Sequence, residues 1–360
     1  MSALFTPLSF SRGPDMKNRF MLAPLTNSQS GADGILSDEE YKWLTMRAEG
    51  GFGLTMTCAA HVQENGQGFP GQLGIWSDDH LEGLNKLASK INACGSISIC
   101  QLHHAGMRSP TELIEGQPVC ASDNEETSAR GLTTEEVKTL VSDFIEGAVR
   151  AEKAGFHGVE IHGAHGYILG QFISPEINFR EDQYGGSLEN RSRVMFEIIE
   201  GIREKCSEGF SIGVRLSPER FGMLLSEVIK VAQKLMDSGQ IEFLDMSLWD
   251  VFKEPEDEAF KGKSLMSYFT ELNRGEVRLG VAGKIQTPAD AEKALAEGAD
   301  WIMLGRAAIL HHDFPNRYQQ NADFQVVKNP VSREHLQNEG LSEKFVAYMA
   351  SWPGFVEEKA

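Results

Sequence analysis

The chain has 360 residues, 41% of them apolar, so it is long enough to bury a large core. Its 52 aspartates and glutamates outnumber its 34 lysines and arginines, which gives a formal net charge of −18. This balance excludes the broad basic face that nucleic acids or anionic membranes require. A phosphate-bearing ligand is not excluded, because a few local donors outweigh distant charges that salt screens over ~8–10 Å.

No two of the five cysteines form a C-x-x-C pair, so neither a zinc ribbon nor an iron–sulfur cluster is predicted. The cysteines are Cys58, Cys94, Cys100, Cys120 and Cys206. An odd number of thiols suits a reducing compartment. The amino-terminal MSALFTPLSF lacks the basic and apolar regions of a secretory signal. No apolar run reaches the length of about 18 residues that spans a membrane. We therefore expect a cytoplasmic protein that contacts neither membrane nor nucleic acid.

Short apolar runs alternate with helical patterns along the chain. The predicted strands cover residues 19–26, 53–59, 96–102, 158–162, 211–216, 242–247, 278–283 and 301–305. Their Ile, Val and Leu residues do not strictly alternate with polar ones, which is typical of strands buried on both faces. Between them, helices are predicted over 133–155, 226–239 and 287–300. Thr133 with Glu136 forms a capping-box pattern, and Thr287 precedes a proline suited to a first helical turn.

Eight strands that alternate with helices favour a (β/α)8 barrel built from one domain over residues 1–360. A doubly wound sheet is the alternative, but it predicts a G-x-G-x-x-G after the first strand, and the chain has none there. The opening LFTPLSF is expected to pack across the barrel bottom. The charged segment WDVFKEPEDEAFKGKS (249–264) predicts a long loop, and a candidate lid, after the sixth strand. Residues 320–360 carry the weakest pattern.

Barrel enzymes carry their chemistry at the carboxyl ends of the strands. Those ends are predicted at Thr26, Ala59, Gln101, His162, Arg215, Gly283 and Gly305–Arg306. The seventh and eighth strands lead into AGKI and LGRA, where small residues stand beside Lys284 and Arg306. Backbone N–H groups near helix starts, joined by a basic side chain, favour a phosphate cradle. The alternative is that these glycines serve only as turns.

The densest group of reactive side chains is the stretch HGAHGYILGQFISPEINFREDQYGGSLENR, which begins at His162. His162, His165 and Tyr167 leave a strand end and enter a loop, so all three rings can project into one cavity. A zinc site among these histidines and the pair His103–His104 is disfavoured, because no carboxylate accompanies them at ligand spacing. No G-x-S-x-G motif predicts an acyl-transfer nucleophile.

These segments resemble the old yellow enzyme family, the FMN-dependent ene-reductases that fold as (β/α)8 barrels. The resemblance begins at NRFMLAPLTNS and continues through PGQLGIW and QLHHAGMRS. It is strongest in the block that starts at His162, returns at GVRLSP and ends at GADWIMLGRAAI. It therefore covers nearly the whole chain. The segment after Arg306 matches poorly, which leaves subunit contacts and a homo-oligomer open.

The resemblance implies a role for each strand-end residue. Pro24, Leu25 and Thr26 would lie beside the ring of a non-covalent FMN, Ala59 and Gln101 would meet its pyrimidine edge, and Arg215 would sit by N1 and O2. Gly283, Lys284, Gly305 and Arg306 would hold the phosphate. His162 and His165 would bind the substrate oxygen, and Tyr167 would donate the proton.

The family's activity implies an enzyme that takes hydride from NAD(P)H and reduces electron-poor alkenes by a ping-pong cycle. α,β-Unsaturated carbonyl or nitro compounds are the expected substrates, as in NADPH dehydrogenases and enoate-type ene-reductases. The chemistry agrees with these roles, because two imidazole donors stabilise charge on a carbonyl oxygen and a phenol is a suitable acid for an enolate-like carbon. Two alternatives remain: a non-redox barrel lyase or isomerase with a phosphorylated substrate, and a flavin-binding redox module without alkene turnover.

Overall fold

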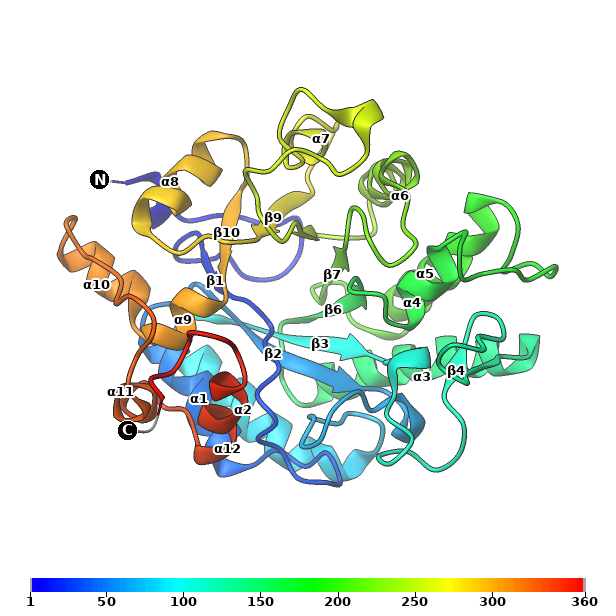
Figure 1. Ribbon diagram of the computed structural model, residues 1–360, viewed down its shortest axis with the longest axis horizontal. Helices are drawn as coiled ribbons and strands as arrows, with labels where there is room; N and C mark the ends of the chain where they lie inside the picture. Colours follow the sequence, from blue (N-terminus) through cyan, green and yellow to red (C-terminus); the bar gives the residue numbers. More distant parts are fainter. Residues whose placement is uncertain (1, 359–360) are drawn as a thin grey trace.

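The computed structural model describes residues 2–358 and has the predicted architecture: eight parallel strands close into a barrel (Figure 1). In chain order the barrel strands are β1 (Phe20–Leu22), β2 (Leu54–His61), β3 (Ile97–His103), β6 (Gly158–Gly163), β7 (Ser211–Leu216), β8 (Phe243–Ser247), β9 (Arg278–Ala282) and β10 (Trp301–Leu304). Pairing of Phe20 with Ile302 and of Met21 with Leu54 closes the cylinder. The (β/α)8 prediction is therefore confirmed.

Each predicted strand coincides with a barrel strand, and the differences lie at the ends. Strand β1 is shorter than expected because the chain leaves the sheet before Pro24, which has no N–H for a ladder. Strand β2 runs two residues beyond the predicted end, to His61, and its register with β3 shifts between Met56 and Ala59. The shift is a β-bulge, which bends the strand and changes the direction of the side chains near its end.

Helices cover the outside of the barrel (Figure 1). They are α1 (Asp38–Glu49), α2 (Leu81–Ala93), α3 (Thr134–Lys153), α5 (Leu188–Lys205), α6 (Leu225–Asp237), α8 (Pro288–Ala296) and α9 (Arg306–Leu310). Thr133 and Thr287 cap their helices as predicted, each with a complete capping box. After β8 only a four-residue helix, α7 (Ser267–Thr270), remains, because the expected insertion occupies residues 249–264. Among residues 2–358, no helix is both long and apolar enough to cross a membrane.

The opening segment closes the amino-terminal end of the barrel, as expected. Leu8 and Met16 are buried and bond to each other through their backbones. They join the inward-facing residues of the strands, such as Ile97 and Trp301, in one apolar cluster, and the ring of Phe10 lies 5.7 Å from that of Trp301. Chemistry inside the barrel is therefore confined to the opposite end.

The shorter elements lie in the connections between barrel strands and toward the two ends of the chain. They are α4 (Ile168–Ile173), α10 (Phe314–Gln320), α11 (Arg333–Asn338), α12 (Glu343–Ala350), the short strands β4 (Val119–Cys120) and β5 (Arg130–Gly131), and the 3-10 turns η1 (Ala3–Phe5), η2 (Glu64–Gly66), η3 (Asp78–His80), η4 (Gly106–Arg108) and η5 (Glu258–Phe260). Helix α12 lies against α1, and the rings of Trp43 and Phe345 meet edge to face at 4.8 Å. The weakly patterned carboxy-terminal segment is thus packed on the barrel wall.

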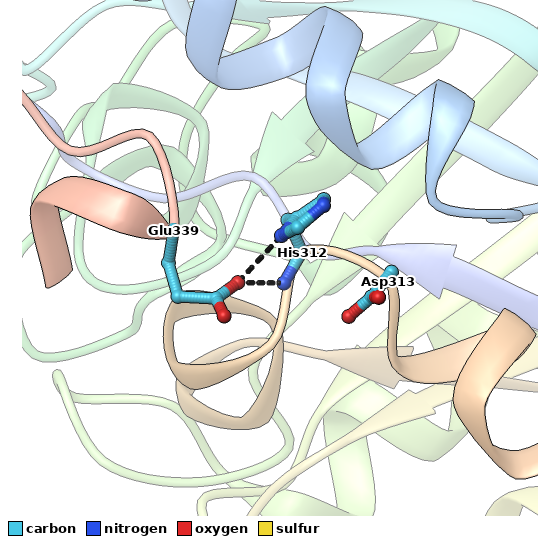
Figure 2. Close-up of side chains that lie close together, drawn as sticks. All are labelled: His312, Asp313 and Glu339. Carbon is cyan, nitrogen blue, oxygen red and sulfur yellow. Dashed lines mark hydrogen bonds and ion pairs between the residues drawn. The ribbon is translucent and has the colours of Figure 1, made fainter. Parts of the chain in front are cut away.

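A polar cluster fastens this segment to the loop after α9 (Figure 2). Glu339, at the end of α11, accepts hydrogen bonds from the backbone N–H and the Nδ1 of His312, both at 2.6 Å. Asp313 pairs with Arg317 at 2.6 Å. Burial opposes ionisation of Glu339, but the hydrogen bonds from His312 outweigh it and lower its pKa from 4.5 to about 2.

We expect Glu339→Gln to lower the free energy of unfolding by about 1–3 kcal/mol at pH 7. Because the folded-state pKa is depressed, this stabilisation is complete above pH 4.5 and is lost as the pH falls toward about 2. The difference between the two proteins should therefore be constant from pH 6 to 8 and shrink in acid. Denaturant unfolding at several pH values measures it, with the exposed Glu208→Gln as control. A difference that does not change with pH would contradict this assignment.

Candidate active site

The three predicted reactive rings lie together at the mouth of the barrel. His162 ends β6, His165 follows in the loop with φ +61°, and Tyr167 immediately precedes α4. The ring of His162 lies 5.1 Å from each of the other two rings, and His165 lies 6.3 Å from Tyr167. A positive φ is uncommon for histidine, and such strained residues persist where the surrounding structure holds them for function.

Hydrogen bonds fix the orientation of both imidazoles. The Nδ1 of His162 accepts the backbone N–H of Ala164 at 3.2 Å, so neutral His162 carries its proton on Nε2. That atom lies 3.3 Å from Nδ1 of His165, whose Nε2 lies 2.7 Å from Oγ of Ser247. The backbone N–H of His165 donates to Oγ of Ser217 at 3.0 Å. The two serines, which end β8 and follow β7, were not predicted.

Both imidazoles are neutral at physiological pH. Burial lowers the pKa of His162 well below 6.5, and positive charge on His165, His103 and Arg215 would add to the effect. Burial is the largest cause that lowers the pKa of His165 to about 3, and the positive charges of Arg215 and Arg108 add to it. Burial raises the pKa of Tyr167, and the nearby Arg108 opposes the increase. The site therefore presents neutral N–H and O–H donors across the physiological range.

A cavity of about 400 Å³ opens beside these rings. Ten of the thirteen predicted site residues line it: Pro24, Leu25, Thr26, Ala59, Gln101, His162, His165, Tyr167, Arg215 and Arg306. They come from six different strand ends and the loops that follow. Small and apolar side chains from the first two strands lie in the same cavity as amide, imidazole and guanidinium groups. This composition suits a flat ligand with a polar edge.

The other three predicted residues, Gly283, Lys284 and Gly305, do not line the cavity. The Lys284 side chain is 60% exposed and pairs with Asp250 at 3.1 Å. A side chain on Gly283 would meet the backbone of Trp249 and Asp250 at 2.7 Å, so this glycine permits two loops to approach closely. A side chain on Gly305 would lie 3.4 Å from Leu25, which places Gly305 beside the cavity wall. Their phosphate role stays a prediction.

Two carboxyl groups lie inside the barrel beneath Gln101 and Arg215. Glu160, fully buried on β6, accepts a hydrogen bond from Nε2 of Gln101 at 2.6 Å. Asp245, fully buried on β8, is the strand partner of Arg215. Burial raises the pKa of Asp245 well above 3.8, and the charge and hydrogen bond of Glu160 raise it further, while Arg215 opposes the shift. The raised pKa favours a protonated Asp245, whose proton is available to Glu160; among residues 2–358 neither carboxyl oxygen of Asp245 has another partner.

Six further residues line the cavity and were not predicted: Arg108, Phe221, Ile309, Tyr348, Met349 and Trp352. Phe69 and Trp249, two aromatic residues from loops, also line the cavity. Tyr268, an aromatic residue of α7, instead donates to the carbonyl of Phe260 at 2.8 Å. Half of the unpredicted residues belong to or follow α12. Sequence reasoning missed them because they carry no motif and reach the mouth only through packing of α12.

The insertion 249–264 is fastened across the loop after β7. Lys253 pairs with Glu219, and the backbone N–H of Glu256 donates to Glu219 at 2.8 Å. Arg220 pairs with Glu256 at 2.8 Å and lies 4.7 Å above the ring of Trp249. These contacts make the insertion a fixed wall of the mouth in this structure.

Among residues 2–358, one group of side chains could offer three ligands to a metal: His312, Asp313 and Glu339 (Figure 2). Both carboxylates already contact Arg317, and His312 is bonded to Glu339, so the cluster is an ion-paired one. The histidines near the cavity have other partners. His103 lies 3.0 Å from Gln72, and His104 accepts from Gly106 at 2.9 Å.

Comparison with known proteins gives one family. The family model described as NADH:flavin oxidoreductase / NADH oxidase matches residues 3–325. A probable NADH-dependent flavin oxidoreductase, YqiG of Bacillus subtilis, is 34% identical over 90% of this chain and 89% of its own. An NADPH dehydrogenase of Bacillus licheniformis is 35% identical over 87% of this chain and 92% of its own.

Solved structures give the same result. The old yellow enzyme homologue of Zymomonas mobilis superposes with a TM-score of 0.81 and 29% identity, covering 95% of this chain and 99% of its own. Some other relatives are longer. This chain spans 52% of a 2-naphthoyl-CoA reductase, at a TM-score of 0.80 and 28% identity.

We expect Asp245→Asn to leave the free energy of unfolding at pH 7 unchanged or to raise it. A carboxyl group whose folded-state pKa is raised stabilises the fold below its unfolded pKa and loses that contribution as the pH rises. The amide is neutral at every pH and has N–H donors to offer Glu160, so its advantage over Asp245 should grow as the pH rises above 3.8, the ordinary value for aspartate.

Asp245→Ala is the matched comparison. It should cost about 2–3 kcal/mol, because it leaves a cavity and a buried carboxylate without its donor. Denaturant unfolding of the three proteins measures these differences. A loss of similar size in Asp245→Asn would show that the fold needs an ionised Asp245.

Proposed function

Because this chain belongs to the NADH:flavin oxidoreductase / NADH oxidase family, the old yellow enzyme family, we propose that it reduces the C=C bond of α,β-unsaturated carbonyl or nitro compounds. Membership makes it an oxidoreductase with non-covalent FMN as cofactor and NAD(P)H as reductant. The observation that carries the proposal is the grouping of two neutral imidazoles and a phenol in one cavity with Gln101 and Arg215. This grouping is what alkene reduction needs beyond a flavin.

The residues of the cavity suit FMN. The buried Nε of Arg215 has no hydrogen-bond partner among the described residues, so a donor is available for an anionic ring edge. Gln101 offers an amide, Ala59 leaves space, and Leu25 supplies apolar contact. Arg306, after β10, is the cavity's basic group at the end where barrels often bind phosphate. When bound, FMN accepts hydride from NAD(P)H and supplies it to the substrate.

In this proposal the histidines bind the substrate oxygen and the tyrosine donates the proton. We assign His162 and His165 to the substrate's carbonyl or nitro oxygen, on which negative charge grows as hydride reaches the β-carbon. Neutral N–H donors at that point act as an oxyanion hole, where losing one donor typically costs ~3–4 kcal/mol. In the free site Nδ1 of His165 accepts the Nε2 proton of His162. When a substrate oxygen takes that proton instead, Ser247 is placed to donate to Nε2 of His165, which would leave a proton on Nδ1 for the substrate.

Tyr167 completes the reaction in this proposal by giving a proton to the α-carbon. Its raised pKa keeps the phenol protonated until the carbon becomes basic. NAD(P)H and the alkene would occupy the same cavity in turn, which gives a ping-pong cycle. A flavin-dependent redox module without alkene turnover is the remaining alternative.

The decisive experiment follows the bound flavin. We expect purified protein with FMN to be yellow, to bleach anaerobically with NADPH or NADH, and to regain its colour on addition of cyclohexenone. Bleaching without recovery, until air is admitted, would favour the redox module. A folded protein that takes up no FMN would contradict the proposal at its root.

Tyr167→Phe should separate the two halves of the cycle. Reduction by NAD(P)H should keep its rate, while reoxidation by cyclohexenone should slow by about 100-fold or more, because general acids contribute ~10²–10⁴. Stopped-flow absorbance measures both rates. Tyr268→Phe, whose hydroxyl bonds to Phe260 outside the cavity, is the control and should alter neither. Equal losses in both halves would remove Tyr167 from the role of proton donor.

A further inference from the structure

Arg108 stands at the cavity mouth without an assigned task. It ends η4, after β3, and its side chain lines the cavity. The guanidinium carbon lies 4.9 Å from the ring centre of Tyr167 and 5.7 Å from that of Phe221. One terminal nitrogen donates to the backbone carbonyl of His165. These three contacts hold the cation in place, which reduces the entropy lost when it binds a ligand.

The charges around the cavity are of one sign. Three arginines line it, Arg108, Arg215 and Arg306, and no aspartate or glutamate does. The chain as a whole carries a net charge of −18, so this is a local reversal of its overall charge. Arg215 and Arg306 face the anionic parts of FMN in the proposed function. Arg108 is then the one cation of the cavity wall that the cofactor does not neutralise.

Arg220, a second arginine near the mouth, has a structural role and serves as a comparison for Arg108. Arg220 also lies over an aromatic ring, that of Trp249, but both of its bonded nitrogens donate to Glu256, at 2.8 and 3.0 Å. Among residues 2–358, no ion pair includes Arg108, whose side chain donates instead to the carbonyl of His165. Arg220 is thus neutralised by the protein itself, whereas Arg108 keeps its charge for a ligand.

We propose that Arg108 forms an anion subsite, and that the preferred substrates are electron-poor alkenes that carry a carboxylate on the reacting bond or close to it. This inference rests on the proposed function, because it names the substrate class of the same site. The guanidinium presents a planar fork of donors that matches a carboxylate. Its place above Tyr167 puts the substrate's anionic end next to the residue assigned as proton donor.

The cation could instead act only on Tyr167, by opposing the rise of the phenol's pKa. The two roles differ in their substrate dependence. An effect through Tyr167 changes the rate for every alkene alike, because each needs the same proton. A carboxylate contact changes the rate for the anionic substrate alone.

The test compares 4-oxo-2-pentenoate with 3-penten-2-one, which carries a methyl group in place of the carboxylate. The methyl ester of the acid controls for the electronic effect of the carboxyl group. The FMN enzyme is reduced anaerobically by light with triethanolamine as the electron donor, so that neither a nicotinamide nor a carboxylate donor competes for Arg108. The second-order rate constant for reoxidation by each alkene is then measured by stopped flow.

We expect the acid to react at least ~10-fold faster with the native enzyme than with Arg108→Gln, as an interaction with a charged hydrogen-bond partner predicts. The ketone and the ester should change by less than ~2-fold. Arg108→Lys should retain part of the preference, because it keeps the charge and loses the fork. Arg220→Gln, the matched control, should leave all three rate constants in the same ratio.

Three results would overturn the subsite. The first is an equal fall for all three alkenes in Arg108→Gln, which assigns Arg108 to Tyr167. The second is that Arg220→Gln slows the acid, relative to the ketone and the ester, as much as Arg108→Gln does. The faster reaction of the acid would then come from the summed positive charge at the mouth and not from a contact with Arg108. The third is a native ratio of acid to ester that Arg108→Gln does not alter. Failure of the proposed function is distinct, because the reduced enzyme would then react with none of the alkenes.

Discussion

The hydrogen-bonded register of the parallel strands determines where the functional groups carried by the strands lie. Across three neighbouring strands, Gln101 pairs with Glu160, and His162 pairs with Arg215. Arg215 in turn pairs with Asp245. Because side chains alternate between the two faces of a strand, a slip of one residue would send these groups out of the barrel. Closure of the sheet prevents such a slip, since no free edge remains.

The same register divides the inside of the barrel into layers of different chemistry. Leu8, Ile97 and Trp301 fill the amino-terminal end with apolar side chains. Above them lie Glu160 and Asp245, and above those the amide, guanidinium and imidazole groups of the mouth. Gln101 donates to Glu160 in the layer below it, whereas Nε of Arg215 has no partner among the described residues and stays available to a ligand.

The sequence was sufficient for the barrel and for the residues that strands present directly. Apolar runs and glycines marked the strand ends, and His162, His165 and Tyr167 lie within one short segment that cannot separate them. Ser247 was not predictable, because only the pairing of β8 brings it to His165. Lys284, assigned by spacing, does not line the cavity; it has a positive φ and pairs with Asp250, and its phosphate role stays a prediction.

The carboxy-terminal residues escaped prediction for a different reason. Tyr348 and Trp352 belong to or follow a helix with no pattern that indicates a cavity, and their position depends on packing between Trp43 and Phe345. Such contacts between residues far apart in the chain leave no local trace in the sequence. The same limit applies to Arg108, whose neighbours Tyr167 and Phe221 come from two other loops.

The position of α12 has an evolutionary consequence. The helix borders the entrance but contributes no strand, no barrel hydrogen bond and none of the groups assigned to the flavin. Selection can therefore exchange aromatic, small or charged residues along it while the redox machinery stays intact. Enzymes that descend from one ancestral reductase could in this way diverge in substrate range, because each keeps the same redox groups behind an entrance of different shape.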